Sequence, residues 1–115
     1  MSAIDLSYLE DLTGGDNEVM KEMIELLIEE TPKHLENIKA AQNEKNWSGL
    51  RAEAHKIKPM FLYVGLIELN ELCKQIEENA KNIQDINSTK ELIAKLESGY
   101  NEVAKDLKLK ASELS

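Results

Sequence analysis

One histidine in the middle of the chain has neighbours that could help it carry a negatively charged group. His55 lies within the stretch AEAHKIKPMFLYVG, residues 52–65. Side chains three or four positions apart meet on the surface of a helix, so Arg51 and Lys58 would lie beside the imidazole. A neutral imidazole is a nucleophile near neutral pH, and nearby cations would attract a phosphoryl group and hold its oxygens. The spacing therefore indicates transient phosphate binding.

The charge around His55 is opposite to that of the whole chain. The net charge is −8 at pH 7, yet residues 45–58 hold four cations and one anion. A negative protein repels nucleic acid and anionic membranes, which argues against both as partners. The positive segment suits an incoming phosphoryl group. It also fits a solvated helix face without function, and composition and periodicity leave both interpretations open.

Four long segments have the three-and-four spacing of apolar residues that is typical of amphipathic helices. Gly14 and Gly15 end a short opening helix, and Asp16 is placed to cap the first long one. The apolar stripe of that helix resumes in phase after Pro32, which predicts a kink and not an end. Its expected inward-facing residues are Met20, Met23, Ile24, Leu27, Thr31, Leu35 and Ile38.

The other three long helices carry signals at their ends. The second is expected from its N-cap Asn46 to Gly65, with Trp47 as a packing anchor, and the third from about Leu66. The last is expected from Ser88, because the spacing of STKE is that of a capping box. The expected inward-facing residues are Leu50, Ala54, Ile57, Phe61 and Val64 in the second helix, Leu69, Leu72, Cys73, Ile76 and Ala80 in the third, and Leu92, Leu96, Tyr100, Val103 and Leu107 in the last.

These segments predict the fold class. Amphipathic helices joined by short loops close most economically as a bundle, and 115 residues suffice for one core. We expect an all-α protein, an antiparallel up-and-down four-helix bundle with a short extra N-terminal helix, as a single domain over residues 1–115. A lone cysteine, the lack of a long apolar run and the lack of an export signal predict a cytoplasmic location. A monomer is the default expectation.

His55 is expected on the outside of this bundle. The inward stripe of its helix includes Ala54 and Ile57, and a step of about 100° per residue turns His55 away from the middle of that stripe. Pro59 lacks the N–H that would bond the carbonyl of His55. We therefore expect a kink just after the histidine, with that carbonyl left for water or a side chain.

The residues around His55 resemble a known signature. AHKIKPMFLYVGL is similar to the signature of histidine-containing phosphotransfer (HPt) domains, in which an Ala-His pair is followed by an apolar residue, a lysine and a glycine, respectively two, three and ten positions after the histidine. Here these are Ala54, His55, Ile57, Lys58 and Gly65. The upstream GGD and the downstream GLIELNELCKQIEE also look like the family, and the resemblance covers about residues 5–110.

The resemblance implies a phosphorelay intermediate. His55 would accept a phosphoryl group from the aspartyl phosphate of one receiver domain and pass it to another, with Lys58 stabilising the phosphoryl oxygens and with Ala54 and Gly65 as structural residues of the site. Receiver domains of response regulators or of a hybrid sensor kinase are the implied partners. The implied carrier has no ATP site, cofactor or metal of its own, since Mg²⁺ belongs to the receiver. The residues expected to dock the partner are Arg51, Lys56, Pro59, Met60 and Leu62.

Two positions depart from the family pattern. Pro59 stands where a glycine is common, and Glu77 stands where the third bundle helix often offers a glutamine to the imidazole. A carboxylate would orient the ring too, but it would oppose an incoming phosphoryl group. Gln75 lies too far round the helix to replace it. Glu77 is therefore left out of the predicted site.

The remaining reactive side chains are weaker candidates. His34 is expected to be a solvated surface residue, because it lies in the acidic first long helix, away from the HPt-like stretch. Pairing it with His55 as metal ligands is unsupported, since neither histidine has a second ligand three or four positions after it. Cys73 is expected as a buried small hydrophobe and not a reactive thiol. The sequence contains neither a phosphate-binding loop nor a Ser-His-Asp set. Nothing in it therefore suggests an enzyme with its own active site. The alternative to a relay protein is a passive helical adaptor that binds partners without phosphotransfer.

Overall fold

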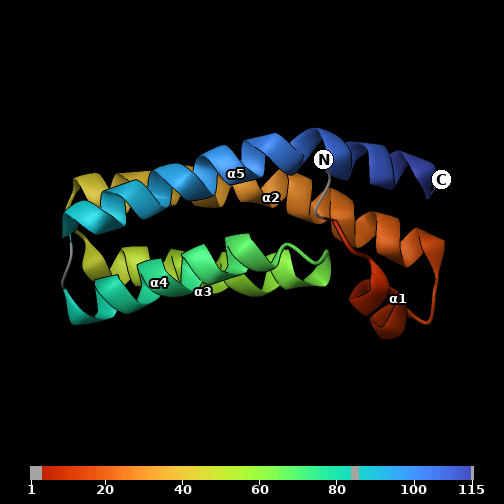
Figure 1. Ribbon diagram of the computed structural model, residues 1–115, viewed down its shortest axis with the longest axis horizontal. Coiled ribbons are helices and arrows are strands. Elements are labelled where there is room, and N and C mark those ends of the chain that lie inside the picture. Colours follow the sequence, from red (N-terminus) through yellow and green to blue (C-terminus); the bar gives the residue numbers. More distant parts are fainter. Residues whose placement is uncertain (1–3, 84–85, 115) are drawn as a thin grey trace.

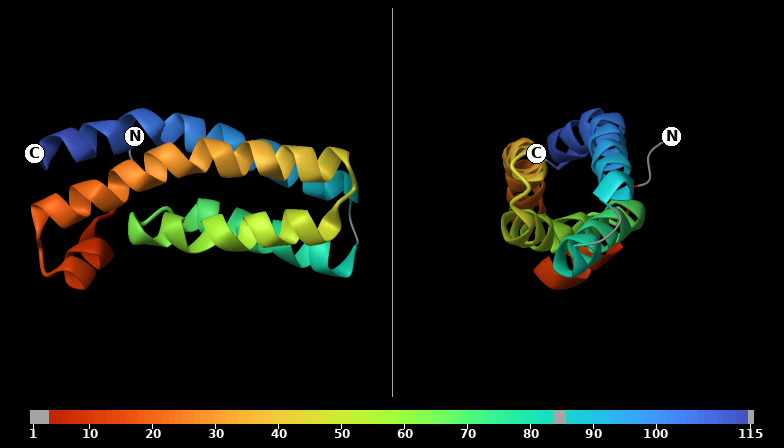
Figure 2. Two further views of the ribbon diagram at one scale, coloured as in Figure 1. Left: turned by 180° about the vertical axis from the view of Figure 1, so that it is seen from behind. Right: turned by 90° about the vertical axis from the view of Figure 1, so that its left-hand side faces the viewer.

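The chain forms one short helix followed by four long ones (Figure 1). The computed structural model describes residues 4–83 and 86–114. Its helices are α1 (Ser7–Thr13), α2 (Asn17–Asn43), α3 (Trp47–Tyr63), α4 (Ile67–Asn82) and α5 (Ile86–Glu113). The four long helices alternate in direction, and each packs against two others, so that they close a ring when seen end-on (Figure 2). This confirms the predicted antiparallel bundle with an extra N-terminal helix.

Helices α2 and α3 begin directly after the predicted capping residues, Asp16 and Asn46. The carboxylate of Asp16 accepts hydrogen bonds from the N–H groups of Glu18 and Val19, at 3.0 and 3.2 Å. The side chain of Asn46 accepts one from the N–H of Gly49 at 3.0 Å. Each bond satisfies a donor that the first turn of a helix leaves without a partner. Both predicted N-caps are confirmed.

The predicted start of the last helix was wrong. Ser88 is the third residue of α5 and does not cap it, because the helix already includes Ile86. The residues directly before Ile86 lie outside the described ones. Thr89 is fully buried and accepts a hydrogen bond at 3.1 Å from the side chain of Asn79 in α4. The STKE motif therefore lies inside α5, where it packs against α4.

The predicted apolar stripes meet in one core. Nearly all of the expected inward-facing residues are buried, and Ile57, Phe61, Ile76 and Leu96 have no exposed surface. The exceptions are Met23, Leu72 and Val103, which are only partly buried but pack against the core, and Trp47 packs there in the same way. This confirms Trp47 as a packing anchor. None of the helices within the described ranges is long and apolar enough to cross a membrane.

The two pairs of helices differ in length. α2 and α5 have 27 and 28 residues, whereas α3 and α4 have 17 and 16. Pro32 lies inside α2, and the helix continues through it as predicted. The longer pair extends past the shorter pair at the end of the bundle where α1 packs, as Figure 1 shows. His55 lies on α3, in the part of the bundle where all four helices are present.

Candidate functional site

His55 lies on the exposed side of α3. Its side chain is 70% exposed, whereas Ala54 and Ile57 on the inner side have no exposed surface. The position follows from helix geometry, since burying the apolar stripe of α3 turns the intervening position outward. The predicted exposure of the histidine is confirmed.

Glu77 of α4 joins His55 and Lys58 in one cluster. One carboxylate oxygen, Oε2, lies 2.5 Å from Nδ1 of His55, and the other, Oε1, accepts a hydrogen bond from Nζ of Lys58 at 2.7 Å. The side chain of Glu77 is 17% exposed and that of Lys58 is 25% exposed. The ion pair is therefore partly shielded from water, while the imidazole that it borders is open to solvent.

The pKa of the Glu77 carboxyl lies below its usual value. Partial burial raises this pKa, but the hydrogen bonds and charges of Lys58 and His55 together outweigh the burial. Glu77 is thus a carboxylate at neutral pH. The sequence interpretation left Glu77 out of the site, whereas in the structure it contacts both residues predicted to handle the phosphoryl group.

Most of the predicted docking residues lie on the same side of α3 as the histidine. Arg51, Lys56, Pro59 and Leu62 are exposed, as is His55. On a helix all four lie within about 100° of His55 around the axis. A shallow hollow beside the imidazole is lined by Ser48, Arg51, Ala52, His55 and Glu77.

Met60 faces a different way from the other four. Its side chain is half-buried and packs against the core. It lines a separate apolar hollow under α1, together with Leu9, Met23, Leu26, Leu27, Tyr63 and Val64. The ring of Tyr63 stacks on Tyr8 of α1, with ring centroids 6.1 Å apart. The structure therefore does not bring Met60 to the imidazole.

The backbone beyond the histidine is supported from α4. Pro59 lies inside α3, which continues to Tyr63. The side chain of Asn70 donates a hydrogen bond at 2.8 Å to the carbonyl of Lys58, the residue just before the proline. α4 thus contacts this turn through the backbone of Lys58 as well as through its ammonium group.

Gly65 makes the turn between α3 and α4. Its φ of +75° is in the left-handed region, and a Cβ there would lie 2.6 to 2.9 Å from atoms of Asp5. The N–H of Asp5 donates to the carbonyl of Val64 at 2.9 Å, which holds the N-terminal segment against the turn. Glycine is required here for its backbone conformation and for the close approach of Asp5.

His34 is not the solvated residue that the sequence predicted. Its side chain is 20% exposed, and its Nδ1 lies 2.7 Å from a carboxylate oxygen of Glu53 in α3. The other oxygen of Glu53 accepts a hydrogen bond from Asn37 at 3.0 Å. The prediction was wrong because the register of α2 against α3 places a carboxylate opposite His34. No group of three or more potential metal ligands occurs among residues 4–83 and 86–114.

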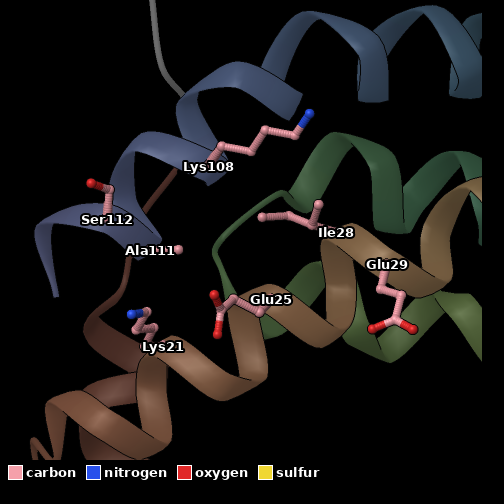
Figure 3. Close-up of a pocket in the computed structure, with 7 residues that line it drawn as sticks. All are labelled: Lys21, Glu25, Ile28, Glu29, Lys108, Ala111 and Ser112. Carbon is pink, nitrogen blue, oxygen red and sulfur yellow. The ribbon is translucent and has the colours of Figure 1, made fainter. Parts of the chain in front are cut away.

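A wider hollow lies between α2 and α5 (Figure 3). It is lined by Lys21, Glu25, Ile28, Glu29, Lys108, Ala111 and Ser112. It mixes two lysines with two glutamates and shares no lining residue with the hollow beside His55. This hollow is therefore separate from the cluster of His55, Lys58 and Glu77.

Comparison with known proteins places this chain in a family. The family model described as Hpt domain matches residues 22–106. Two crystal structures are similar over nearly their whole length. The Hpt domain of an Hpt sensor hybrid histidine kinase from Shewanella has a TM-score of 0.83 and 20% identity, covering 98% of this chain and 97% of that one. The histidine-containing phosphotransfer protein B of Pseudomonas aeruginosa PAO1 has a TM-score of 0.82 and 21% identity, covering 96% of each chain. No curated protein matches the chain.

A four-helix bundle with an exposed histidine on one helix fits the class of phosphotransfer carriers. The chain belongs to the Hpt domain family, because the family model covers well over half of it. Its role is histidine phosphotransfer in a phosphorelay, and the passive adaptor is not favoured. Members of this family carry phosphoryl groups and interact with receiver domains and hybrid kinases.

Proposed function

We propose that His55 is the residue that carries the phosphoryl group, and that Lys58 stabilises the oxygens of that group. The observation that supports this most is the cluster itself: a histidine with 70% of its side chain exposed, beside the ammonium of Lys58 and oriented by Glu77. Nδ1 faces the carboxylate, so Nε2 is the ring nitrogen left for attack. His34, the other histidine, is largely buried and paired with Glu53.

The proposed transfer begins with the lone pair of Nε2. This nitrogen attacks the phosphorus of an aspartyl phosphate on a receiver domain, forming an N–P bond as the P–O bond breaks. The receiver's aspartate leaves as a carboxylate with the electron pair. The reverse reaction on a second receiver passes the phosphoryl group on. Lys58 and Arg51 supply positive charge that holds the phosphoryl oxygens as they arrive.

The proposed docking surface is the exposed side of α3 around His55. Arg51, Lys56, Pro59 and Leu62 lie on it, and the hollow lined by Ser48 and Ala52 lets a partner approach the ring. Leu62 is 41% exposed and supplies an apolar contact one to two turns from the histidine. Met60 lies off this surface, half-buried in the separate hollow under α1, and is left out of the proposed docking surface.

The remaining features of the proposal concern the chain as a whole. Residues 1–115 act as one unit, as a monomer, without a cofactor or metal of their own, and the Mg²⁺ needed for transfer is bound by the receiver. A cytoplasmic location is supported by the lone, unpaired Cys73, which suits a reducing compartment.

The test is transfer of phosphate from receiver domains charged by a small phosphodonor and Mg²⁺. Mass spectrometry should find an acid-labile, base-stable label on His55. The His55→Gln variant should show none, although it should still fold, because the side chain is 70% exposed and contributes nothing to the core. His34→Gln is the matched control and should keep the label. If a broad panel of receivers leaves the wild-type protein unlabelled, or if His55→Gln is labelled equally, the assignment is wrong.

A further inference from the structure

A groove runs along the outside of the bundle where α4 packs against α5. Two adjoining hollows form it, and they share the lining residues Glu68, Leu69 and Gly99. The other lining residues are Gly65, Leu66, Ile67, Glu71, Leu72, Lys95, Glu102 and Val103. All of them belong to α4, to α5 or to the turn before α4, and none lines the hollow beside His55. Seen end-on, α3 and α5 lie at opposite corners of the ring of helices (Figure 2). The groove is therefore separate from the proposed phosphotransfer site.

The floor of the groove is apolar. Leu66 and Leu69 belong to the core, and Leu72 and Val103 are only partly buried against it. Ile67, the first residue of α4, lines one end of the groove and is 69% exposed. Within residues 4–83 and 86–114 no other large apolar side chain is as exposed. A partner that covered this end would remove apolar surface from water, which favours binding.

Gly99 keeps the middle of the groove open. Glycine weakens the interior of a helix, and this one lies well inside α5. A Cβ at this position would lie 2.7 Å from Cδ2 of Leu69. The glycine therefore lets α4 and α5 approach closely, and it leaves no side chain of its own above the apolar floor.

The rim of the groove is negatively charged. Among its lining residues are three glutamates and one lysine: Glu68 and Glu71 from α4, and Glu102 and Lys95 from α5. All four residues are exposed. In the part of the chain that the structure describes, none of the three glutamates forms an ion pair. Their charges are thus available to the cations of a partner, and complementary charge selects partners and speeds their association.

We propose that this groove binds a short amphipathic helix of a partner protein, whose apolar stripe is flanked by lysine or arginine. Residues 4–83 and 86–114 form helices and no sheet, so they offer no strand edge to an extended peptide. A groove between two helices instead receives the apolar side of a third helix, through residues spaced i, i+3 or i+4, and i+7. From Lys95 to Val103 the groove extends over about 12 Å of α5, which matches about two turns of such a helix.

Charge distinguishes this occupant from a second copy of the chain. A second copy carries a net charge of −8 and would bring further carboxylates to the three glutamates of the rim. A basic helix would place cations beside them. Because the groove lies on α4 and α5, a helix bound there would leave the exposed side of α3 accessible to a receiver domain.

The test is selection of binders from a display library of helix-forming peptides that is randomised at every position. The enriched peptides should combine an apolar stripe with flanking lysines or arginines. When the tightest peptide is added, the ¹H–¹⁵N NMR signals of Ile67 and Gly99 should shift, and that of His55 should not. If no peptide is enriched, if the enriched peptides are not basic, or if the shifts centre on α3, the proposal is wrong.

Variants of the groove supply the second readout, measured by fluorescence anisotropy of the selected peptide. Glu68→Lys/Glu102→Lys should weaken binding by about 5-fold to 30-fold, because two exposed ion pairs are lost. Glu22→Lys/Glu44→Lys is the matched control, since it changes the net charge equally at exposed positions outside the groove. In 0.15 M salt, which screens charges beyond about 8 Å, this control should bind like wild type. Equal losses in the two double variants would overturn the proposal.

Two further variants separate the remaining outcomes. Ile67→Ser should also weaken binding of the peptide, and it should fold normally because the side chain is largely exposed. His55→Gln should bind the peptide like wild type, so this test does not depend on the proposed phosphotransfer. Sedimentation velocity of the protein alone should show a monomer. A dimer that Ile67→Ser abolishes would assign the groove to a second copy and overturn the proposal.

Discussion

The hydroxyl of Tyr100 in α5 donates a hydrogen bond to the backbone carbonyl of Ile28 in α2, at 3.4 Å. This carbonyl lies four residues before Pro32, which has no N–H to bond it. Tyr100 is 4% exposed, so its hydroxyl group needs a partner inside the bundle. The packed neighbour helix thus supplies a donor to the carbonyl that the proline leaves without one.

This relationship predicts that the cost of losing the Tyr100 hydroxyl depends on Pro32. Tyr100→Phe should lower the free energy of unfolding by about 1 to 2 kcal/mol, because the carbonyl of Ile28 is left without a donor. In a Pro32→Ala background the restored N–H can bond that carbonyl, and the same change should cost clearly less. Urea unfolding of the four proteins measures the difference. Equal costs in the two backgrounds would show that the two residues act independently.

A second prediction concerns the turn between α3 and α4. Gly65→Ala should destabilise the protein by about 2 kcal/mol or more, because it combines a left-handed backbone with a Cβ that would overlap Asp5. Gly15→Ala is the control, since its φ is +79° but nothing lies within 4 Å of an added Cβ. That variant should lose only the backbone contribution, about 1 kcal/mol. Thermal unfolding of both compares them, and equal losses would exclude a role for the contact with Asp5.

A third prediction follows from the lowered pKa of Glu77. A carboxyl group whose pKa is lower in the folded protein than in the unfolded chain stabilises the fold when ionised. This contribution is present above the unfolded value, near 4.5, and is lost as the pH falls through the folded value. Wild type should therefore be more stable than Glu77→Gln at neutral pH. The difference in free energy of unfolding between the two proteins should become smaller as the pH falls through the lowered pKa of Glu77. Urea midpoints over a pH series measure this, with Glu78→Gln as the control; a constant gap would contradict it.

A fourth prediction concerns the only cysteine. Cys73 has no exposed surface, and burial raises the pKa of its thiol to about 12. The thiolate, which is the reactive form, is therefore scarce at ordinary pH. A thiol-specific reagent at mildly alkaline pH should leave the native protein unmodified and should label it rapidly in urea. Rapid labelling of the native protein would mean that α4 opens readily.

The sequence predicted those features that are determined within a single helix. Apolar spacing indicated which face of each helix is buried, and hence that His55 is exposed and Cys73 is not. It could not predict contacts between helices, because these depend on how far one helix is shifted along another. Glu77 meets His55, and Glu53 meets His34, only in the observed register. The start of α5 was also missed, because the STKE motif lies inside the helix and Thr89 packs against α4.

The different lengths of the helices have a consequence for how the protein opens. Where α2 and α5 extend past α3 and α4, each residue has fewer packed neighbours, and local unfolding costs less there than in the four-helix part. Amide protons of the extended ends should therefore exchange with deuterium well before those in the middle of α3. The turn that bears His55 then belongs to the last region to open, so fluctuations at the α1 end leave the orientation of the imidazole undisturbed.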